Sequence, residues 1–310
     1  MDRLAGIVEQ LEARLGARGG EPVPLEGGIT NRNFRVVLGG RDYVLRLCGK
    51  DTEALGIDRP TECRAAERAA ALGIAPPVAL RLEDENVLVT AFVPGRTADA
   101  ETLRRPEVLA RVARALRAFH DGPPLDAIFD VPTVVEQQRE VVLARGGSLP
   151  PELDAALATA RRIQATLRGP AHDPVPCHND LLAANFILDG TTGSAGGGPT
   201  VRIVDWEYAG MNDRFFDLGN FAVNNELDEG GERRLLEAYF GGAPTDGQLA
   251  ALGLYRYISD LREAMWGVVQ TVLSDLDFDY RAYAAEHFDR MGRTAADPRF
   301  EEWLAVAGRA

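Results

Sequence analysis

Two short apolar runs in the second half of the chain are bordered by polar residues whose types and spacing suit metal binding and proton transfer. His178, Asp180 and Asn185 precede the run FIL, and Asp205 follows the run VRIV. If the runs pair as an antiparallel hairpin centred on residue 195, in the glycine-rich segment TTGSAGGGPT, Asn185 and Asp205 lie opposite each other at its open end. An amide oxygen beside a carboxylate suits Mg²⁺ that also holds water and a polyphosphate. Asp180, one loop earlier, could accept the proton of a hydroxyl nucleophile.

Each of these residues alone has a plainer interpretation. Asn and Asp at strand ends are common turn residues, and an isolated His-x-Asp is weak evidence for a site. A metal-dependent hydrolase could use His178 and Asp180 as ligands, but the sequence offers no further His/Asp ligand set beside them. The joint pattern of His-x-Asp, Asn, hairpin and Asp therefore favours a nucleotide-linked metal site.

The elements that must position these groups fall on two sides of the Pro94-Gly95 pair, which breaks the local pattern. Before it, β-type runs alternate with glycine pairs and polar turns, as expected for an antiparallel sheet. An amphipathic helix over residues 1–18 precedes these runs, and an alanine-rich helix over residues 60–72 interrupts them. We therefore predict a small N-terminal lobe, residues 1–93.

After Pro94-Gly95, the sequence is mainly helical. Apolar residues recur with a 3.6-residue period over residues 109–120, 152–167 and 252–273, and the only strand-like runs belong to the hairpin. We predict a larger, mostly helical C-terminal lobe, residues 94–310, that carries the catalytic loop and a substrate pocket. The fold class is α+β with two lobes.

Composition limits the compartment and the partners. The 310 residues include three scattered cysteines, fit no disulfide framework and contain no apolar run of membrane-spanning length. The charged, amphipathic start is unlike a signal peptide. The formal net charge of −13 disfavours nucleic-acid binding. We expect a cytoplasmic protein with no membrane span, in which a homodimer is possible.

The segments HNDLLAAN and IVDWEYAG resemble the choline/ethanolamine kinase family, within the aminoglycoside-phosphotransferase and protein-kinase-like superfamily. The resemblance extends from GGITNRNFRV to FDYRAYAAEHFDRM. It implies a bilobal protein-kinase-like fold that uses ATP and Mg²⁺, with Asp180 as catalytic base. By the same resemblance Asn185 and Asp205 bind the metal, whereas His178 and Asp217 are structural.

The expected nucleotide site begins in the segment EGGITNRNFRV. The glycine pair that includes Gly28 lets the backbone approach a phosphate, and Thr30 and Asn31 add donors. The same pair is equally typical of a plain hairpin turn, and only its position, which is similar to the family's phosphate turn, favours binding. In DYVLRL, alternation places Val44 and Arg46 on one face, to meet the adenine and the phosphates.

Arg46 needs a carboxylate to orient it, and Glu62 and Glu67 are the candidates. Five residues place them about 140° apart on a helix, so both cannot face the site. We choose Glu62 because it shares a face with small alanines that should pack on the sheet. Residues 90–93, including Thr90 and Phe92, should form the hinge beside the adenine.

The expected acceptor site combines carboxylates and aromatic rings. Glu207 and Tyr208 follow the metal-binding Asp, and the resemblance of AMWGVVQ and FDYRAYAAEHFDRM to the family's pocket segments adds Trp266 and Tyr280. Aromatic faces attract a poorly hydrated cation. Many family members have a second tryptophan three residues after the first, where this chain has Val269.

The resulting prediction is a small-molecule kinase that phosphorylates a cationic alcohol, with choline first and ethanolamine second. A related phosphotransferase acting on an aminoglycoside, thiamine or another hydroxylated amine would share every catalytic residue. A catalytically silent kinase-like binding module is a further alternative.

Overall fold

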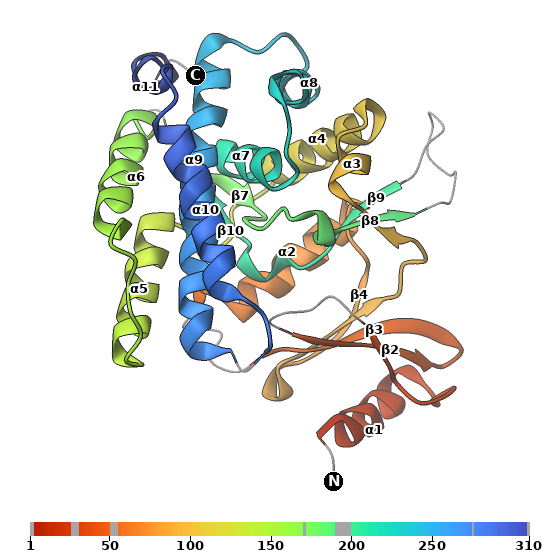
Figure 1. Ribbon diagram of the computed structural model, residues 1–310. Helices are drawn as coiled ribbons and strands as arrows, with labels where there is room; N and C mark the ends of the chain where they lie inside the picture. Colours follow the sequence, from red (N-terminus) through yellow and green to blue (C-terminus); the bar gives the residue numbers. More distant parts are fainter. Residues whose placement is uncertain are drawn as a thin grey trace.

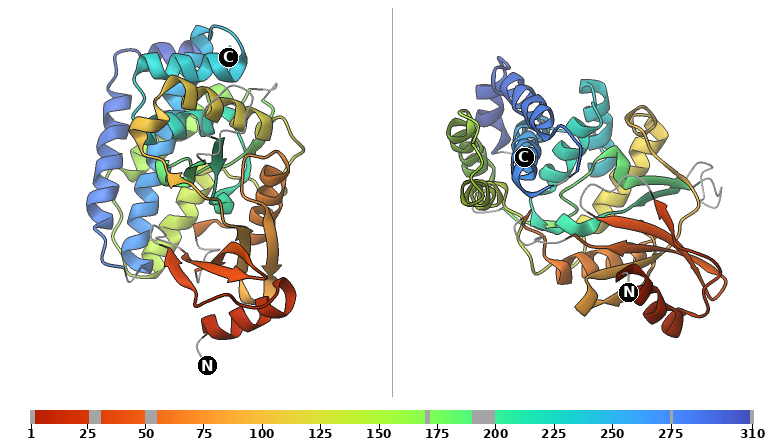
Figure 2. Two further views of the ribbon diagram at one scale, coloured as in Figure 1. Left: turned by 90° about the vertical axis from the view of Figure 1, so that its right-hand side faces the viewer. Right: turned by 60° about the horizontal axis from the view of Figure 1, so that its bottom comes forward.

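The computed structural model describes residues 3–25, 31–49, 55–169, 172–189, 200–274 and 276–308. A twisted sheet with a helix beneath it lies at one end of the molecule, and packed helices make up the other (Figures 1 and 2). The elements of the first part are α1 (Arg3–Leu15), β1 (Val23–Leu25), β2 (Arg32–Leu38), β3 (Arg41–Leu47), α2 (Arg59–Ala71), β4 (Val78–Leu82), the 3₁₀ turn η2 (Glu83–Glu85) and β5 (Val87–Ala91).

The five strands form one antiparallel sheet in the order β1-β2-β3-β5-β4. Gly39 and Gly40 connect β2 to β3 with positive φ angles of 56° and 73°, which the favoured two-residue hairpin turn requires. Helix α1 buries Ile7 and Leu11 against the inner side chains of this sheet in a small apolar cluster of its own. This arrangement matches the predicted antiparallel lobe.

Helix α2 differs from the prediction in what it packs against. Its small-residue face, Ala65, Ala66 and Ala69, belongs to the larger apolar cluster of the helical part rather than to the sheet's own cluster. Thus α2 connects the two parts through contacts with β4 and with the turn η4 (Trp206–Tyr208). The predicted boundary between residues 93 and 94 stays a prediction.

The remaining elements follow the Pro94-Gly95 break. They are β6 (Arg96–Thr97), α3 (Ala100–Leu103), α4 (Pro106–His120), α5 (Val131–Ala144), α6 (Leu153–Leu167), β7 (Val175–Cys177), η3 (Ala183–Asn185), β8 (Phe186–Asp189), β9 (Thr200–Ile203), η4, β10 (Gly210–Asn212), α7 (Arg214–Asn224), α8 (Glu229–Phe240), α9 (Asp246–Leu273), α10 (Tyr280–Ala295) and α11 (Phe300–Ala307). The combination of a small antiparallel sheet and a larger helical part confirms the predicted α+β class.

Three short strands in this part were not predicted. β7 pairs with β10, and β6 pairs with the β8–β9 hairpin. Each has only two or three residues, which is too short for alternation to be recognised in the sequence. β7 and β10 matter because they flank the polar residues of the expected catalytic loop.

Helix α9 is the centre of the helical part (Figure 1). It contacts α5, α6, α7, α8, α10 and α11, and nearly every residue from Gly247 to Gln270 is buried. A capping box formed by Thr245 and Gln248 starts it earlier than the apolar periodicity indicated. No helix in the described ranges is long and apolar enough to span a membrane.

Candidate active site

A cavity of about 510 Å³ lies between the sheet and the helical part. This volume is within the usual range for small-ligand sites, about 300–1,000 Å³. Its walls combine strands β3 and β5 with the loops after β7 and β9 and with one turn of α9. The lining includes Asp180, Asn185 and Asp205 from the opening pattern.

The loop after β7 is held from behind by α7. Both carboxylate oxygens of Asp217 accept backbone hydrogen bonds, from the N–H of His178 at 2.8 Å and from the N–H of Asn179 at 2.8 Å. His120 Nε2 lies 3.0 Å from the same carboxylate, which is fully buried. Asn179 has a φ of 68°, so the chain turns sharply just before Asp180.

His178 does not point at the cavity as a ligand. Its Nδ1 accepts the backbone N–H of Asp180 at 3.2 Å, and its Nε2–H donates to the carbonyl of Val204 at 3.0 Å. Because Nδ1 must keep its lone pair to accept the first bond, the two bonds together require the neutral ring with its proton on Nε2. Burial lowers the pKa of His178 to about 4, against a weaker opposing effect of the nearby Asp217 carboxylate. The histidine therefore fastens the loop to the strand that precedes Asp205.

The hairpin register differs from the predicted one by one residue. Phe186 pairs with Ile203, and the N–H of Val204 donates to the carbonyl of Asn185 at 2.9 Å, so Asn185 is opposite Val204 rather than Asp205. The prediction was wrong here because Asp205 has already left the ladder, with a left-handed φ of 67°. This turn still brings the Asp205 side chain into the cavity that Asn185 lines.

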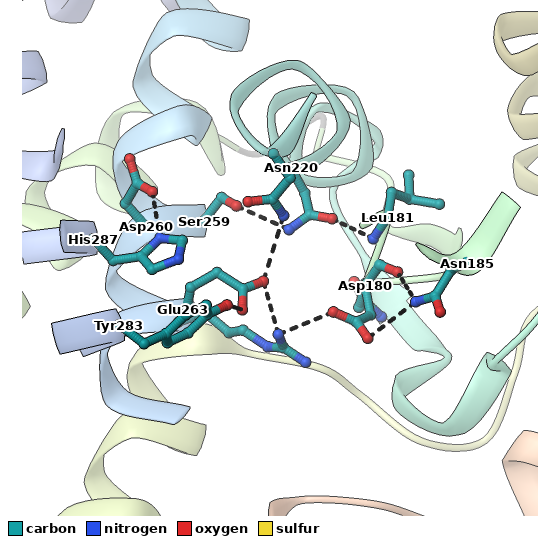
Figure 3. Close-up of polar contacts among 12 residues, drawn as sticks. Asp180, Leu181, Asn185, Asn220, Ser259, Asp260, Glu263, Tyr283 and His287 are labelled. Atoms are coloured by element: carbon teal, nitrogen blue, oxygen red, sulfur yellow. Dashed lines mark hydrogen bonds and ion pairs between the residues drawn. The ribbon is translucent and has the colours of Figure 1, made fainter. Parts of the chain in front are cut away.

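Asn185 is held in place by contacts with Asp180. Its Nδ2 donates to the Asp180 carbonyl at 2.8 Å and lies 3.3 Å from the Asp180 carboxylate (Figure 3). Both amide hydrogens are thereby directed toward Asp180. The amide oxygen, which is the atom a metal requires, is left as the acceptor on the other side.

A group of alternating charges surrounds Asp205. Arg46 Nη1 lies 2.8 Å from Glu62 and 2.8 Å from Asp205, and Arg59 lies 2.6 Å from Glu62 and 3.3 Å from Glu207. Of the two candidates on α2, Glu62 is thus the one that contacts Arg46.

Glu67, the other candidate, is exposed one turn further along α2. It contacts Cys63 instead of Arg46.

These carboxylates could hold a cation. Oxygen atoms of Glu62, Asp205 and Glu207 lie within 4.8 Å of one another, and oxygen donors of this kind are those Mg²⁺ prefers. Burial raises the pKa of Asp205, an effect that Arg46 opposes and Glu207 reinforces. Burial likewise raises the pKa of Asp180, against the nearby Arg262 guanidinium. The residues present therefore fit a divalent cation.

At the sheet end, Val44 and Arg46 line the cavity together, as do Thr90 and Phe92. The backbone N–H of Phe92 donates to the Asp42 carbonyl at 3.0 Å, so Phe92 contributes its side chain rather than a backbone donor.

The glycine-rich turn gives a different result. Asn31 uses its Nδ2 on Glu207, at 2.9 Å, instead of presenting it to a phosphate. Glu207, expected on the acceptor side, therefore joins the sheet lobe to the carboxylates around Asp205. The predicted Gly28 and Thr30 lie outside the described residues.

At the opposite end, Tyr208, Trp266 and Tyr283 line the cavity. The Trp266 and Tyr283 rings are 5.5 Å apart and nearly perpendicular. Tyr280, predicted for this wall, is buried against Trp266 and is not among the lining residues. Its hydroxyl lies 2.9 Å from Ser274 Oγ at the C-terminal end of α9. Val269 is fully buried and does not line the cavity either.

Two charged residues that line the cavity, Arg262 and Glu263, were not predicted from the sequence. Arg262 Nη1 lies 3.1 Å from the Asp180 carboxylate and 2.8 Å from Glu263, and Glu263 also accepts the Tyr283 hydroxyl at 2.8 Å (Figure 3). Burial favours a higher pKa for Glu263, yet Arg262 and its other partners lower it. The available signal was the group of charges Asp260, Arg262 and Glu263 in a mainly apolar stretch of helix.

Comparison with known proteins identifies a matching family, similar sequences and similar structures. The sequence model of the phosphotransferase enzyme family matches residues 21–252. Ethanolamine kinase 2 of Rattus norvegicus is 28% identical over 291 residues, which cover 85% of this chain and 73% of the relative. Probable choline kinase 2 of Arabidopsis thaliana is 24% identical over 93% of this chain and 89% of its own length. A crystal structure of a choline/ethanolamine kinase family protein from Mesorhizobium loti has a TM-score of 0.80 and 28% identity, over 98% of this chain and all of that one.

Proposed function

The chain belongs to the phosphotransferase enzyme family and is a kinase, and we propose that it uses ATP and Mg²⁺ to phosphorylate the hydroxyl of a small amino alcohol, with choline or ethanolamine as the substrate. The family resemblance seen in the catalytic loop is thereby confirmed. The named activities of the relatives, on ethanolamine and choline, support this acceptor class.

The observation that carries the proposal is the order of groups along one cavity. Arg46 and the carboxylates around Asp205 lie at the sheet end, Trp266 and Tyr283 lie at the helical end, and Asp180 lines the cavity with both groups. A nucleotide at the first end and an amine at the second would bring a hydroxyl and a terminal phosphate to Asp180. Phosphoryl transfer needs little more than such positioning and charge neutralisation.

Each residue then has a distinct task. Asp180 accepts the proton of the acceptor hydroxyl, as a base within hydrogen-bond reach of the nucleophile. Arg46, which Glu62 orients, binds phosphate oxygens, while Val44 and the residues of the hinge contact the base of the nucleotide. Asn185 and Asp205 would hold Mg²⁺. When bound, the metal would neutralise charge on the transferring phosphate.

The acceptor end suits a positively charged substrate. Asp180 and Glu263 are carboxylates that line this end of the cavity, and Arg262 balances only one of the two charges. Aromatic rings there add attraction for an ammonium group.

The test is a coupled ADP-release assay with choline, ethanolamine, thiamine and an aminoglycoside as separate acceptors. We expect turnover with one of the first two, dependence on Mg²⁺, and none without an acceptor. Asp180→Ala should reduce kcat by about 10²–10⁴ while nucleotide binding, measured by calorimetry, survives. Turnover with thiamine or the aminoglycoside alone would refute the acceptor class, and full activity of Asp180→Ala would refute the role of the base.

A further inference from the structure

A cage for a quaternary ammonium group needs aromatic faces. At the acceptor end of this cavity, charged side chains occupy some of the positions where such faces would be needed. Along α9, the positions that line the cavity are Arg262, Glu263 and Trp266. Val269, three residues after Trp266, is buried away from it. The neighbour of Trp266 on the cavity wall is therefore the carboxylate three residues before it, and the helix supplies only one ring.

Arg262 occupies a place that a substrate cation would otherwise take. Its guanidinium lies 4.3 Å from the centre of the Tyr208 ring, well within the range of a cation–π contact. The same group touches Asp180 through Nη1 at 3.1 Å. With the side chain almost fully buried, this internal cation covers the face of Tyr208. Of the three described rings named for this end, Trp266 and Tyr283 remain for contact with a substrate cation.

Glu263 offers hydrogen bonding in place of a third ring. Its carboxylate accepts Arg262 Nη1 at 2.8 Å, the Tyr283 hydroxyl at 2.8 Å and Asn224 Nδ2 at 3.5 Å (Figure 3). An ionised carboxylate has about four acceptor positions, so these bonds leave capacity for another donor. An ammonium N–H can use that capacity, whereas a quaternary nitrogen presents only methyl groups.

We propose that Arg262 and Glu263 are specificity-determining residues, which make the enzyme prefer an amino alcohol with N–H groups on its nitrogen over a quaternary ammonium alcohol. The proposal rests on the proposed function, since it concerns the acceptor of the same reaction. Arg262 excludes the bulky trimethylated cation from the face of Tyr208, and Glu263 binds an N–H of the smaller ammonium.

The experiment measures kcat/KM by ADP release for ethanolamine, its N-methyl and N,N-dimethyl derivatives, and choline. Each methyl group removes one N–H donor and adds bulk. We expect kcat/KM to fall along the series, with choline lower than ethanolamine by about 10- to 100-fold, the size of effect expected for a hydrogen bond to a charged group. Equal values, or a preference for choline, would overturn the inference and leave the proposed function intact. No turnover with any of the four would overturn both.

Variants separate recognition from mere structural support. Glu263→Gln keeps the shape and should lower kcat/KM for ethanolamine far more than for choline, which flattens the series. Arg262→Met uncovers the face of Tyr208 and should raise the ratio of kcat/KM for choline to kcat/KM for ethanolamine. Any effect of this substitution on Asp180 acts on both substrates and therefore cancels in the ratio. The matched control is Glu286→Gln, on the exposed side of α10, which should leave the series unchanged.

Equal losses for all four alcohols in Glu263→Gln would mean a structural role and would refute the inference. Thermal unfolding and nucleotide binding check that each variant is folded. If Glu263→Gln or Arg262→Met does not fold, the methylation series on the wild-type protein decides alone.

Discussion

Asp217→Asn tests the support of the catalytic loop. The carboxylate is fully buried, and its oxygens accept the N–H groups of His178 and Asn179 at 2.8 Å each. Asparagine keeps the shape but turns one oxygen into an NH₂ group, which then faces a backbone N–H. Losing a hydrogen bond to a charged group costs about 1.5–3 kcal/mol, and an unpaired buried donor costs about 1–3 kcal/mol. We expect the free energy of unfolding to fall by about 3–5 kcal/mol.

The same variant should impair catalysis because Asp180 is carried by the loop that Asp217 holds. A displacement of about 1 Å at a reacting group can reduce the rate about 10²-fold, so we expect a loss of that order in kcat with little change in the KM for ATP. Urea unfolding and the ADP assay measure the two effects. The control is Asp228→Asn: Asp228 is exposed and caps α8 by accepting the Gly231 N–H at 2.6 Å, which asparagine does equally well.

Unchanged stability and unchanged kcat in Asp217→Asn would show that the loop does not depend on this carboxylate. A loss of stability with full kcat would mean that Asp217 supports the fold without positioning Asp180. Either result would refute the reasoning that connects α7 to the base.

Two further predictions concern Glu62 and His178. Glu62→Gln removes the charge that contacts Arg46 and Arg59, so kcat/KM for ATP should fall about tenfold or more. The control is Glu67→Gln, exposed on the same helix, which should match the wild type. Equal effects of the two substitutions would contradict the choice of Glu62. The pKa of His178 is about 4 in the folded protein, below its ordinary 6.5, so between these pH values the unfolded chain binds a proton that the folded protein does not. The contribution of His178 to the free energy of unfolding is therefore fully present above about pH 6.5 and is lost as the pH falls toward 4. Between about pH 7 and pH 5 this group should contribute a loss of about 2 kcal/mol, measured as the difference in urea unfolding between the wild type and His178→Gln; parallel pH profiles of the two proteins would refute it.

Much of the site could be predicted because its chemistry is concentrated in one short segment. Asp180, Asn185 and Asp205 all line the cavity, although the register that was used to bring the last two together was wrong. That argument placed Asn185 opposite Asp205, with the hairpin centre at residue 195 in the glycine-rich segment. The register instead follows the alternation of buried side chains, with Phe186 and Leu188 facing the core on one strand and Val201 and Ile203 on the other.

Other parts depend on contacts between distant segments, which local patterns do not contain. Asn31 was expected at a phosphate, but it meets Glu207, 176 residues away, so its donor is engaged within the protein. Tyr280 and Tyr283 are both aromatic and nearly one turn apart, and only the packing of α10 on α9 decides which of them reaches the cavity. The family resemblance indicated this segment but did not show which of its aromatic rings faces the cavity.

The charges on α9 show how a site can be recognised once burial is known. Asp260, Arg262 and Glu263 are each at most 3% exposed, and burying ions is expensive unless every one is paired. Asp260 is paired with His287 at 2.9 Å and with Arg290, on the α10 side of the helix, and needs no ligand to explain it. Arg262 is paired with both Glu263 and Asp180, and Arg262 and Glu263 both line the cavity. An apolar pair at these two positions would avoid the cost of burying two ions, so their presence beside Asp180 is not explained by stability and supports the proposed recognition of the acceptor.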